Sequence, residues 1–188
     1  MTPAPAPEPH DVAPSSWVVR FAPLVGEGGR VLDVACGRGR HATFFAMRGC
    51  EVTAVDRDAS CLAALAGVAN VRCIEADLEA APWPLPGERF DAVVVTNYLH
   101  RALFPTLVAA VADDGVLLYE TFARGNEKHG RPTRPEFLLA PDELLAAVRP
   151  RLRVVAFEQG LVGGARPAVV QRVAAVAAGR AWPSALPA

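Results

Sequence analysis

The stretch VLDVACGRGRH, residues 31–41, joins an apolar run to a glycine-rich turn. Residues 30–35 form a nearly continuous apolar run, which favours a strand buried on both faces of a sheet. Gly37 and Gly39 follow at once, and the pattern over residues 40–48 is helical. A strand, a glycine turn and a helix in this order place backbone N–H groups and a helix N-terminus where a ligand can approach.

Short apolar runs rich in β-branched residues alternate with helical patterns along the rest of the chain. This alternation is typical of βαβ units and predicts an α/β fold with a doubly wound, mostly parallel sheet. We expect strands at residues 30–35, 51–56, 71–76, 90–96, 116–122, 152–157 and 168–174. We expect helices at residues 15–25, 40–48, 58–66 and 101–112, a turn at 113–115, and a last helix that begins at 141–143.

The length and composition of the chain favour one domain. The 188 residues are 52% hydrophobic and carry a formal net charge of −1, so the chain can bury one core but lacks the overall positive charge typical of nucleic-acid binding. Prolines in residues 1–14 predict a disordered tail, and residues 178–188 predict a flexible end. A single domain over residues 15–177 is therefore expected.

The cysteines and the hydropathy pattern exclude several classes of protein. The four cysteines, which lie in or beside apolar runs, form no C-x-x-C pair. This usage predicts reduced, mostly buried thiols in a cytoplasmic protein with no metal site. We expect neither a signal peptide nor a membrane span, because the chain has no apolar run of about 18 residues. Both a monomer and a homodimer are compatible with the sequence.

The glycine turn has two interpretations. GRGRHA at residues 37–42 satisfies the G-x-G-x-x-G/A pattern of dinucleotide-binding domains, but short glycine patterns are common. Asp56, at the end of the second expected strand, can bind the two hydroxyls of a ribose, and both nucleotide-binding families place an acid there. These residues alone therefore fit either a nicotinamide dinucleotide or another adenosine-containing ligand.

Two further acids separate these interpretations. Asp33 lies near the carboxyl end of the first strand, where a carboxylate would repel a pyrophosphate and attract an ammonium or sulfonium group. Asp33 could also cap the following loop, but a carboxylate in an apolar run needs a partner, so we favour a role toward the ligand. Asp77 follows the third strand and can accept a hydrogen bond from an adenine amino group, with Ala76 and Leu78 beside the ring. Together these residues favour S-adenosylmethionine.

Four motifs occur in one order and spacing, namely VLDVACGRGRH, VTAVDRD, IEADL and FDAVVVTNYLH. On these motifs the chain resembles the class I S-adenosylmethionine-dependent methyltransferases from about Val18 to Val173, and within them it is similar to the small tellurite-resistance-type bacterial group. The resemblance implies a Rossmann-like, seven-stranded sheet of order 3-2-1-4-5-7-6 with the last strand antiparallel. It also implies S-adenosylmethionine as methyl donor and a small-molecule acceptor, with neither nucleic acid nor membrane as partner.

The resemblance also implies which residues bind the cofactor. They are Asp33, Ala35, Gly37 and Gly39 at the methionine part, Asp56 and Arg57 at the ribose, Ala76, Asp77 and Leu78 at the adenine, and Asn97 with Tyr98 below the methyl group. At the position of Ala35 the family often has glycine, which suggests a slightly tighter loop in this chain.

Polar residues after the fourth and fifth strands are the candidates for catalysis. Tyr98, His100 and Glu120 lie at the rim where open α/β sheets bind ligands. His100 could remove a proton from the acceptor, or it could simply be a polar residue at a helix start. The polar segment 123–139 is too long for a simple connection and predicts a substrate lid. The candidate substrate residues are Arg101, Asn126, His129 and Arg131.

These features predict methyl transfer to a small acceptor. No N/D-P-P-Y/F motif follows the fourth strand, where TNYLH stands, and this favours a thiol, hydroxyl or soft oxyanion over an amide or amine acceptor. Arginine and histidine side chains around the rim would suit an oxyanion or a carboxylate-bearing compound. Two alternatives stay open: a regulatory protein that binds S-adenosylmethionine without turnover and, less favoured, a nicotinamide-dependent reductase.

Overall fold

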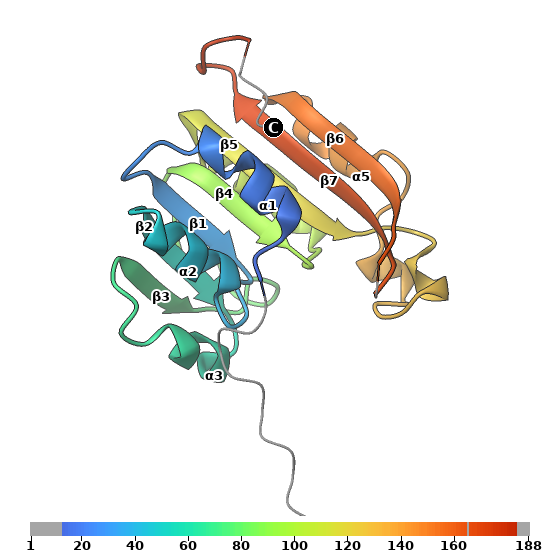
Figure 1. The fold of residues 1–188 in the computed structure, drawn as a ribbon, viewed down its shortest axis with the longest axis horizontal. Coiled ribbons are helices and arrows are strands. Elements are labelled where there is room, and N and C mark those ends of the chain that lie inside the picture. Colours follow the sequence, from blue (N-terminus) through green and yellow to red (C-terminus); the bar gives the residue numbers. More distant parts are fainter. Residues whose placement is uncertain (1–12, 165, 184–188) are drawn as a thin grey trace, which may run out of the picture.

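A computed structural model describes residues 13–164 and 166–183 of the chain. Most of the proline-rich segment for which we predicted disorder, and residues 184–188, lie outside this part. The described residues form one seven-stranded sheet of order β3-β2-β1-β4-β5-β7-β6 (Figure 1).

The strands are β1 (Arg30–Val34), β2 (Glu51–Asp56), β3 (Val71–Glu75), β4 (Phe90–Thr96), β5 (Val111–Phe122), β6 (Leu152–Val162) and β7 (Ala168–Ala177). The α-helices are α1 (Ser16–Phe21), α2 (Arg40–Met47), α3 (Ala59–Leu62), α4 (Phe104–Ala109) and α5 (Glu143–Val148). Short 3-10 helices are η1 (Ala22–Leu24), η2 (Ala63–Leu65), η3 (Arg101–Leu103), η4 (Asn126–Lys128) and η5 (Pro135–Phe137).

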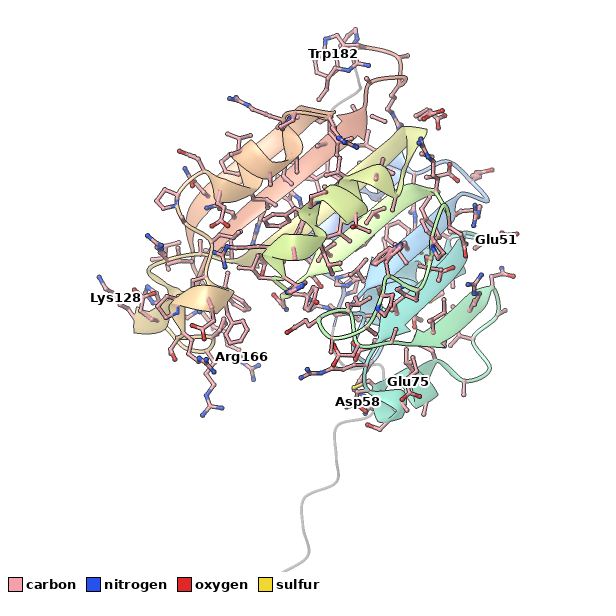
Figure 2. All side chains as sticks on the ribbon, turned by 180° about the vertical axis from the view of Figure 1, so that it is seen from behind. Glu51, Asp58, Glu75, Lys128, Arg166 and Trp182 are labelled. Carbon is pink, nitrogen blue, oxygen red and sulfur yellow. The ribbon has the colours of Figure 1, made fainter. Side chains whose placement is uncertain are left out.

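The strand directions confirm the fold that the resemblance implied. Neighbouring strands from β3 to β5 are parallel, and β7 runs antiparallel to both β5 and β6. In Figure 1, α1 and α2 lie across one face of the sheet, while α4 and α5 cover the other face, which Figure 2 turns to the front. The fold is therefore an α/β sheet covered on both faces.

Both faces of the central strands are buried, which explains their continuous apolar runs. In β4, Val93 and Val95 belong to the core that includes residues of α4 and α5, while Ala92 and Val94 belong to the core that includes residues of α1 and α2. Trp17 of α1 is only 2% exposed, and its indole nitrogen donates a hydrogen bond to the Val173 carbonyl at 3.2 Å. This contact holds α1 against the sheet.

The structure differs from the prediction at the ends of several elements. The expected helices at 15–25, 58–66 and 101–112 are each split into an α-helical and a 3-10 turn. The expected turn at 113–115 is part of β5, because the strand starts at Val111 and its register against β4 shifts between Phe90 and Ala92. Local patterns do not show such a shift, since it depends on the neighbouring strand.

The cysteine prediction is half correct. None of the four cysteines forms a disulfide, and Cys36 and Cys50 are buried, but Cys61 is partly exposed and Cys73 is exposed on β3. Cys73 is exposed because β3 is an edge strand that alternates between partly buried and exposed residues. Within residues 13–164 and 166–183, no helix has the length and hydrophobicity needed to cross a bilayer.

The topology places the functional segments together. Because β1 to β5 are parallel, their carboxyl ends meet at one edge of the sheet. The chain continues from β1 to β2 on one side and later returns to β4 on the other, so the strand order reverses beside β1. Open α/β sheets bind ligands in the crevice at such a point.

Candidate functional site

The glycine turn after β1 has a left-handed backbone at three alternate positions. The φ angles are +50° at Ala35, +54° at Gly37 and +79° at Gly39. A Cβ on Gly37 would meet no described atom within 4 Å, whereas a Cβ on Gly39 would collide with the Leu65 side chain. Gly37 therefore leaves the backbone open to a ligand, and Gly39 is required by packing. Ala35 adopts the left-handed conformation despite its Cβ, at a cost of about 1–2 kcal/mol.

Asp33 is 1% exposed, and its Oδ2 accepts a hydrogen bond from the Ala42 amide at 2.9 Å. Burial raises its pKa to about 7, although the Ala42 N–H and the charge of Arg40 act in the opposite direction. The contact shows the loop-capping role that we had weighed against ligand binding. Because Asp33 lines neither cleft described below, it can act on a ligand through its charge but not by direct contact.

A first cleft of about 220 Å³ opens at the carboxyl ends of β1 to β4. Most of its lining consists of residues that the sequence predicted to bind the cofactor, and Glu79 is an addition. The lining residues are Ala35, Asp56, Arg57, Ala76, Asp77, Leu78, Glu79 and Tyr98. A volume of this size matches part of a nucleoside.

The two predicted carboxylates of the first cleft are held by backbone amides. Asp56 accepts from the Gly37 amide at 2.8 Å and from the Asp58 amide at 2.9 Å, one on each oxygen. Oδ1 of Asp77 accepts from the Glu79 amide at 2.9 Å, and such bonds hold the Asp77 pKa below its usual value. Each carboxylate oxygen can accept more than one hydrogen bond, so both acids keep capacity for ligand hydroxyls or an amino group.

Tyr98 lies at the same end of the first cleft as these acids. Burial raises its pKa to about 12, and the charges of Glu79 and Asp77 act in the same direction. Its hydroxyl is shielded from solvent and has no hydrogen-bond partner among the described residues. Because an unpaired buried hydroxyl costs about 1–3 kcal/mol, a ligand that bonds to it would be stabilised. Tyr98 therefore lines the first cleft with a hydroxyl that is available to a ligand.

His100 and Arg101 lie outside both clefts, which differs from the catalytic and substrate roles predicted for them. The charge of His100 contributes to the low pKa of Asp77, so His100 lies on the cofactor side. Arg101 binds Glu143 at 2.5 Å and donates to the backbone carbonyls of residues 136 and 138. These contacts occupy its guanidinium and hold the 123–139 segment against the start of α5, and the substrate role of Arg101 stays a prediction.

A second, larger cleft of about 700 Å³ lies beside the first. It is bounded by the start of α1, the ends of β4 and β5, the 123–139 segment and the start of β7. The lining residues are Ser15, Ser16, Arg40, Asn97, Glu120, Phe122, Asn126, His129, Gly130, Arg131, Arg166, Pro167, Ala168 and Arg172. Asn97 lines this cleft and its neighbour Tyr98 lines the first, so the two clefts adjoin at the end of β4.

The second cleft brings together five predicted residues: Asn97, Glu120, Asn126, His129 and Arg131. It also contains three arginines to which the sequence assigned no role: Arg40, Arg166 and Arg172. Arg40 stands in the opening motif, where its charge could equally be solvated. The other two come from the β6–β7 hairpin, and no local signal places them at this edge.

Glu120 is buried and held on both oxygens. The Ser15 hydroxyl donates to Oε1 at 2.9 Å, and the Arg172 guanidinium lies 2.6 Å from Oε2. The geometry therefore supports an orienting role for Glu120, with Arg172 as the group that it orients.

Asn126 supports the second cleft because its side chain forms hydrogen bonds with backbone groups of neighbouring segments. Its amide donates to the Pro132 carbonyl at 3.2 Å, and its carbonyl oxygen accepts from the Val169 amide at 3.1 Å. The side chain is only 1% exposed. Asn126 therefore ties the 123–139 segment to β7, and His129, Gly130 and Arg131 are the exposed members of that segment in the cleft.

A buried histidine holds the wall of the second cleft. His41 accepts a hydrogen bond from the Ser15 amide on Nε2 at 3.1 Å, and its Nδ1 lies 3.4 Å from the Thr96 hydroxyl. Burial lowers the pKa of His41 to about 3, so the ring is neutral at physiological pH. Sequence reasoning quoted His41 within the first motif but assigned no role to it.

The family model described as "Methyltransferase domain" matches residues 31–113. This match contains the glycine turn, all three carboxylates of the first cleft and the end of β4, within a sheet of the expected order. Residues 31–113 thus carry a methyltransferase domain, and the sheet has the strand order of the class I S-adenosylmethionine-dependent methyltransferases. The methyltransferase match thus coincides with the first cleft, whereas most of the second cleft lies outside the matched residues.

Two curated methyltransferases are similar in sequence. The trans-aconitate 2-methyltransferase of Paracidovorax citrulli is 31% identical over 162 residues, which cover 79% of this chain and 61% of the relative. The ubiquinone biosynthesis O-methyltransferase of Dechloromonas aromatica is 33% identical over 110 residues, which cover 53% of this chain and 44% of the relative. This chain therefore spans about three fifths or less of either relative.

Solved structures share the fold. TehB from Haemophilus influenzae has a TM-score of 0.72 at 19% identity, and the match covers 85% of this chain and 61% of the TehB chain. A TehB-like SAM-dependent methyltransferase from Corynebacterium glutamicum has a TM-score of 0.62 at 17% identity and covers 86% of each chain. The similarity to the tellurite-resistance-type methyltransferases thus extends to the arrangement of the sheet.

Proposed function

We propose that this protein transfers a methyl group from S-adenosylmethionine to a small-molecule acceptor. The observation that carries the proposal is the pair of clefts that adjoin between Asn97 and Tyr98 at the end of β4. The first cleft has the residues that fit an adenosine, and the second is open to a separate small molecule. A donor and an acceptor bound in this way would be neighbours at one strand end.

The residues of the first cleft fit the proposed donor. Asp56 can accept from the ribose hydroxyls, and Asp77 can accept from the adenine amino group. The open backbone at Gly37 can receive the methionine part, and the charge of Asp33 would favour a cation nearby. When bound, S-adenosylmethionine supplies an electrophilic methyl group on a sulfonium.

The protein's own task is to position the acceptor and exclude water. The sulfonium is intrinsically reactive, so alignment of the acceptor with the methyl–sulfur bond carries most of the rate. Ser15, Ser16 and part of the 123–139 segment form walls of the second cleft and would restrict water there. A thiol, a hydroxyl or a soft oxyanion can serve as the nucleophile.

The relatives support a small acceptor. One is named for trans-aconitate, and the other for O-methylation in ubiquinone biosynthesis. The free cysteines support a reducing compartment such as the cytoplasm.

Calorimetry on the full chain tests the proposed function. We expect S-adenosylmethionine and S-adenosylhomocysteine to bind and NADH not to bind. Asp77→Ala removes a charged acceptor and should weaken S-adenosylhomocysteine binding by about 10–100-fold, because a hydrogen bond to a charged group contributes about 1.5–3 kcal/mol. The matched control is Asp113→Asn, at an exposed surface acid far from the clefts, and it should bind normally.

Two outcomes would contradict the proposal. Binding of NADH in place of both S-adenosyl compounds would favour a reductase. Release of no S-adenosylhomocysteine across thiols, phenols, carboxylates, selenite and tellurite, with normal cofactor binding, would favour a regulatory protein without turnover.

A further inference from the structure

The second cleft carries a large excess of positive charge. Arg40, Arg131, Arg166 and Arg172 line it, and Glu120 is the one carboxylate among its described lining residues. Glu120 pairs with Arg172 at 2.6 Å, so the charges of these two largely cancel. Three guanidinium groups remain, and within the described part of the chain none of them forms an ion pair with a carboxylate.

The arginines come from separate parts of the chain. Arg40 begins α2, Arg131 lies in the 123–139 segment, and Arg166 precedes β7. Figure 2 shows Arg166 at the same end of the molecule as Lys128, away from Asp58 and Glu75. Guanidinium groups on three segments around one cleft can hold an acceptor that carries more than one anionic group, because each can bind a carboxylate through two hydrogen bonds.

The one carboxylate among the described lining residues of this cleft is already held by other groups. Both Glu120 oxygens are engaged, by Ser15 and by Arg172. His129, the one histidine among the described lining residues, is exposed. An acceptor that attacks as an anion already formed at pH 7 needs no base to remove a proton, and a carboxylate, with a pKa near 4, is in this state.

We propose, on the basis of the proposed function, that the acceptor is a small di- or tricarboxylate and that the product is its methyl ester. One carboxylate oxygen forms a bond to the methyl carbon while the carbon–sulfur bond breaks. The electron pair of that bond stays on sulfur, so the sulfonium becomes a neutral thioether and the carboxylate becomes a neutral ester. No proton is taken up or released. The remaining carboxylates keep their charge and hold the acceptor to Arg131 and Arg166.

Binding to the full chain loaded with S-adenosylhomocysteine tests the recognition step without turnover. The probes are acetate, succinate, tricarballylate and inorganic phosphate at one fixed ionic strength. We expect tricarballylate and succinate to bind at least tenfold more tightly than acetate or phosphate. Arg131→Gln and Arg166→Gln should each weaken that binding by about tenfold. Arg151→Gln, the same change at an exposed arginine just before β6 at the opposite edge of the sheet, should not.

Turnover tests the bond that forms. In a weakly buffered assay with a pH indicator at pH 7, we expect S-adenosylhomocysteine to appear with fewer than about 0.1 protons released per turnover, and mass spectrometry should show a base-labile methyl ester. The S-adenosylhomocysteine affinity of every variant, measured in parallel, reports whether the first cleft is intact.

Several outcomes would overturn the proposal. Release of one proton per turnover with a hydroxyl or thiol acceptor would contradict the proposed carboxylate acceptor and would still agree with methyl transfer. Preferred methylation of selenite, carboxylates that bind without being methylated, or carboxylate binding unaffected by both arginine variants would each overturn it too. Failure of S-adenosylhomocysteine to bind at all would instead remove the proposed function.

Discussion

The two clefts at the carboxyl edge of the sheet are built in different ways. The first takes its lining from short segments that directly follow β1 to β4, and three of its eight lining residues are acids. The second draws on α1, α2, the 123–139 segment and the β6–β7 hairpin, and four of its lining residues are arginines. Acids held by backbone amides suit the adenosine part of the methyl donor, which is constant. Arginines that are distant in the sequence and are brought together by packing suit an acceptor, which can differ between relatives.

The largest effect is expected from substitution of Asp56, which should weaken binding to the first cleft and leave binding to the second cleft nearly unchanged. Asp56→Ala removes a ribose acceptor and the carboxylate that holds the Gly37 amide. We expect S-adenosylhomocysteine affinity to fall by about 100-fold or more, since two charged hydrogen bonds are lost. Tricarballylate binding to the second cleft should change less than about threefold, because none of the three unpaired arginines contacts Asp56. Calorimetry with both ligands measures the two effects.

Asp56→Asn provides a second variant in case the alanine variant does not fold, and circular dichroism shows whether each variant is folded. Retention of wild-type S-adenosylhomocysteine binding by both variants would show that the first cleft is not the adenosine site.

An intermediate effect is expected at Asp33, whose pKa is raised by burial from 3.8 to about 7. Because the folded state holds the proton more tightly than the unfolded state, the carboxyl's contribution to stability is complete below pH 3.8 and is lost as the pH rises through 7. Asp33→Asn stays neutral and keeps an acceptor for the Ala42 amide. We expect its Tm to exceed wild type by roughly 5 °C at pH 8 and to match it near pH 4.

Differential scanning fluorimetry from pH 4 to 8 measures this difference. The same variant should bind S-adenosylmethionine several-fold more weakly than wild type and S-adenosylhomocysteine almost equally, because only the former carries a sulfonium. A lower Tm than wild type at pH 8 would contradict the cost assigned to the buried charge.

The smallest effect is expected at Ser15, in the wall of the second cleft. Its hydroxyl accepts from the Trp17 amide at the start of α1 and donates to Glu120. Ser15→Ala should cost about 1 kcal/mol, typical of a lost helix cap, and lower the Tm by about 2–4 °C. Carboxylate affinity should fall by about twofold to fivefold, since Glu120 then orients Arg172 less firmly, while cofactor affinity stays unchanged.

Ser15→Thr, which keeps the hydroxyl, should restore both properties. If the alanine variant lowered cofactor affinity instead, the two clefts would not be independent at this wall.

The prediction from sequence was most successful where the signal is local. The glycine turn follows β1, Asp56 ends β2 and Asp77 lies just after β3, so the strand pattern alone places them at one edge. The helix that starts after Asp58 was correct for the same reason, because the Asp58 carboxylate accepts from the Ser60 amide two residues later. Such contacts need no knowledge of the rest of the fold.

The sequence was less informative where contacts join distant segments. His100 and Arg101 follow β4, as the other rim residues do, but the 123–139 segment folds back onto Arg101 and engages it. Arg172 is separated from Glu120 by 52 positions in the chain, and only the antiparallel pairing of β5 with β7 places them side by side. Nothing in the local pattern around Arg172 indicates that pairing.

The amino-acid sequence by itself determined the sheet, the glycine turn and the acids that line the first cleft, because hydrophobic periodicity and strand-end motifs act over a few residues. The tertiary structure decided which side chains line the second cleft, because its walls come from α1, α2 and a hairpin that meet only when both faces of the sheet are covered. It also decided that Glu120 is held by Ser15 and Arg172, and that the charge of Asp33 is buried. Charge and hydrogen bonding at those positions depend on residues that are distant in the sequence and become neighbours only in the folded structure.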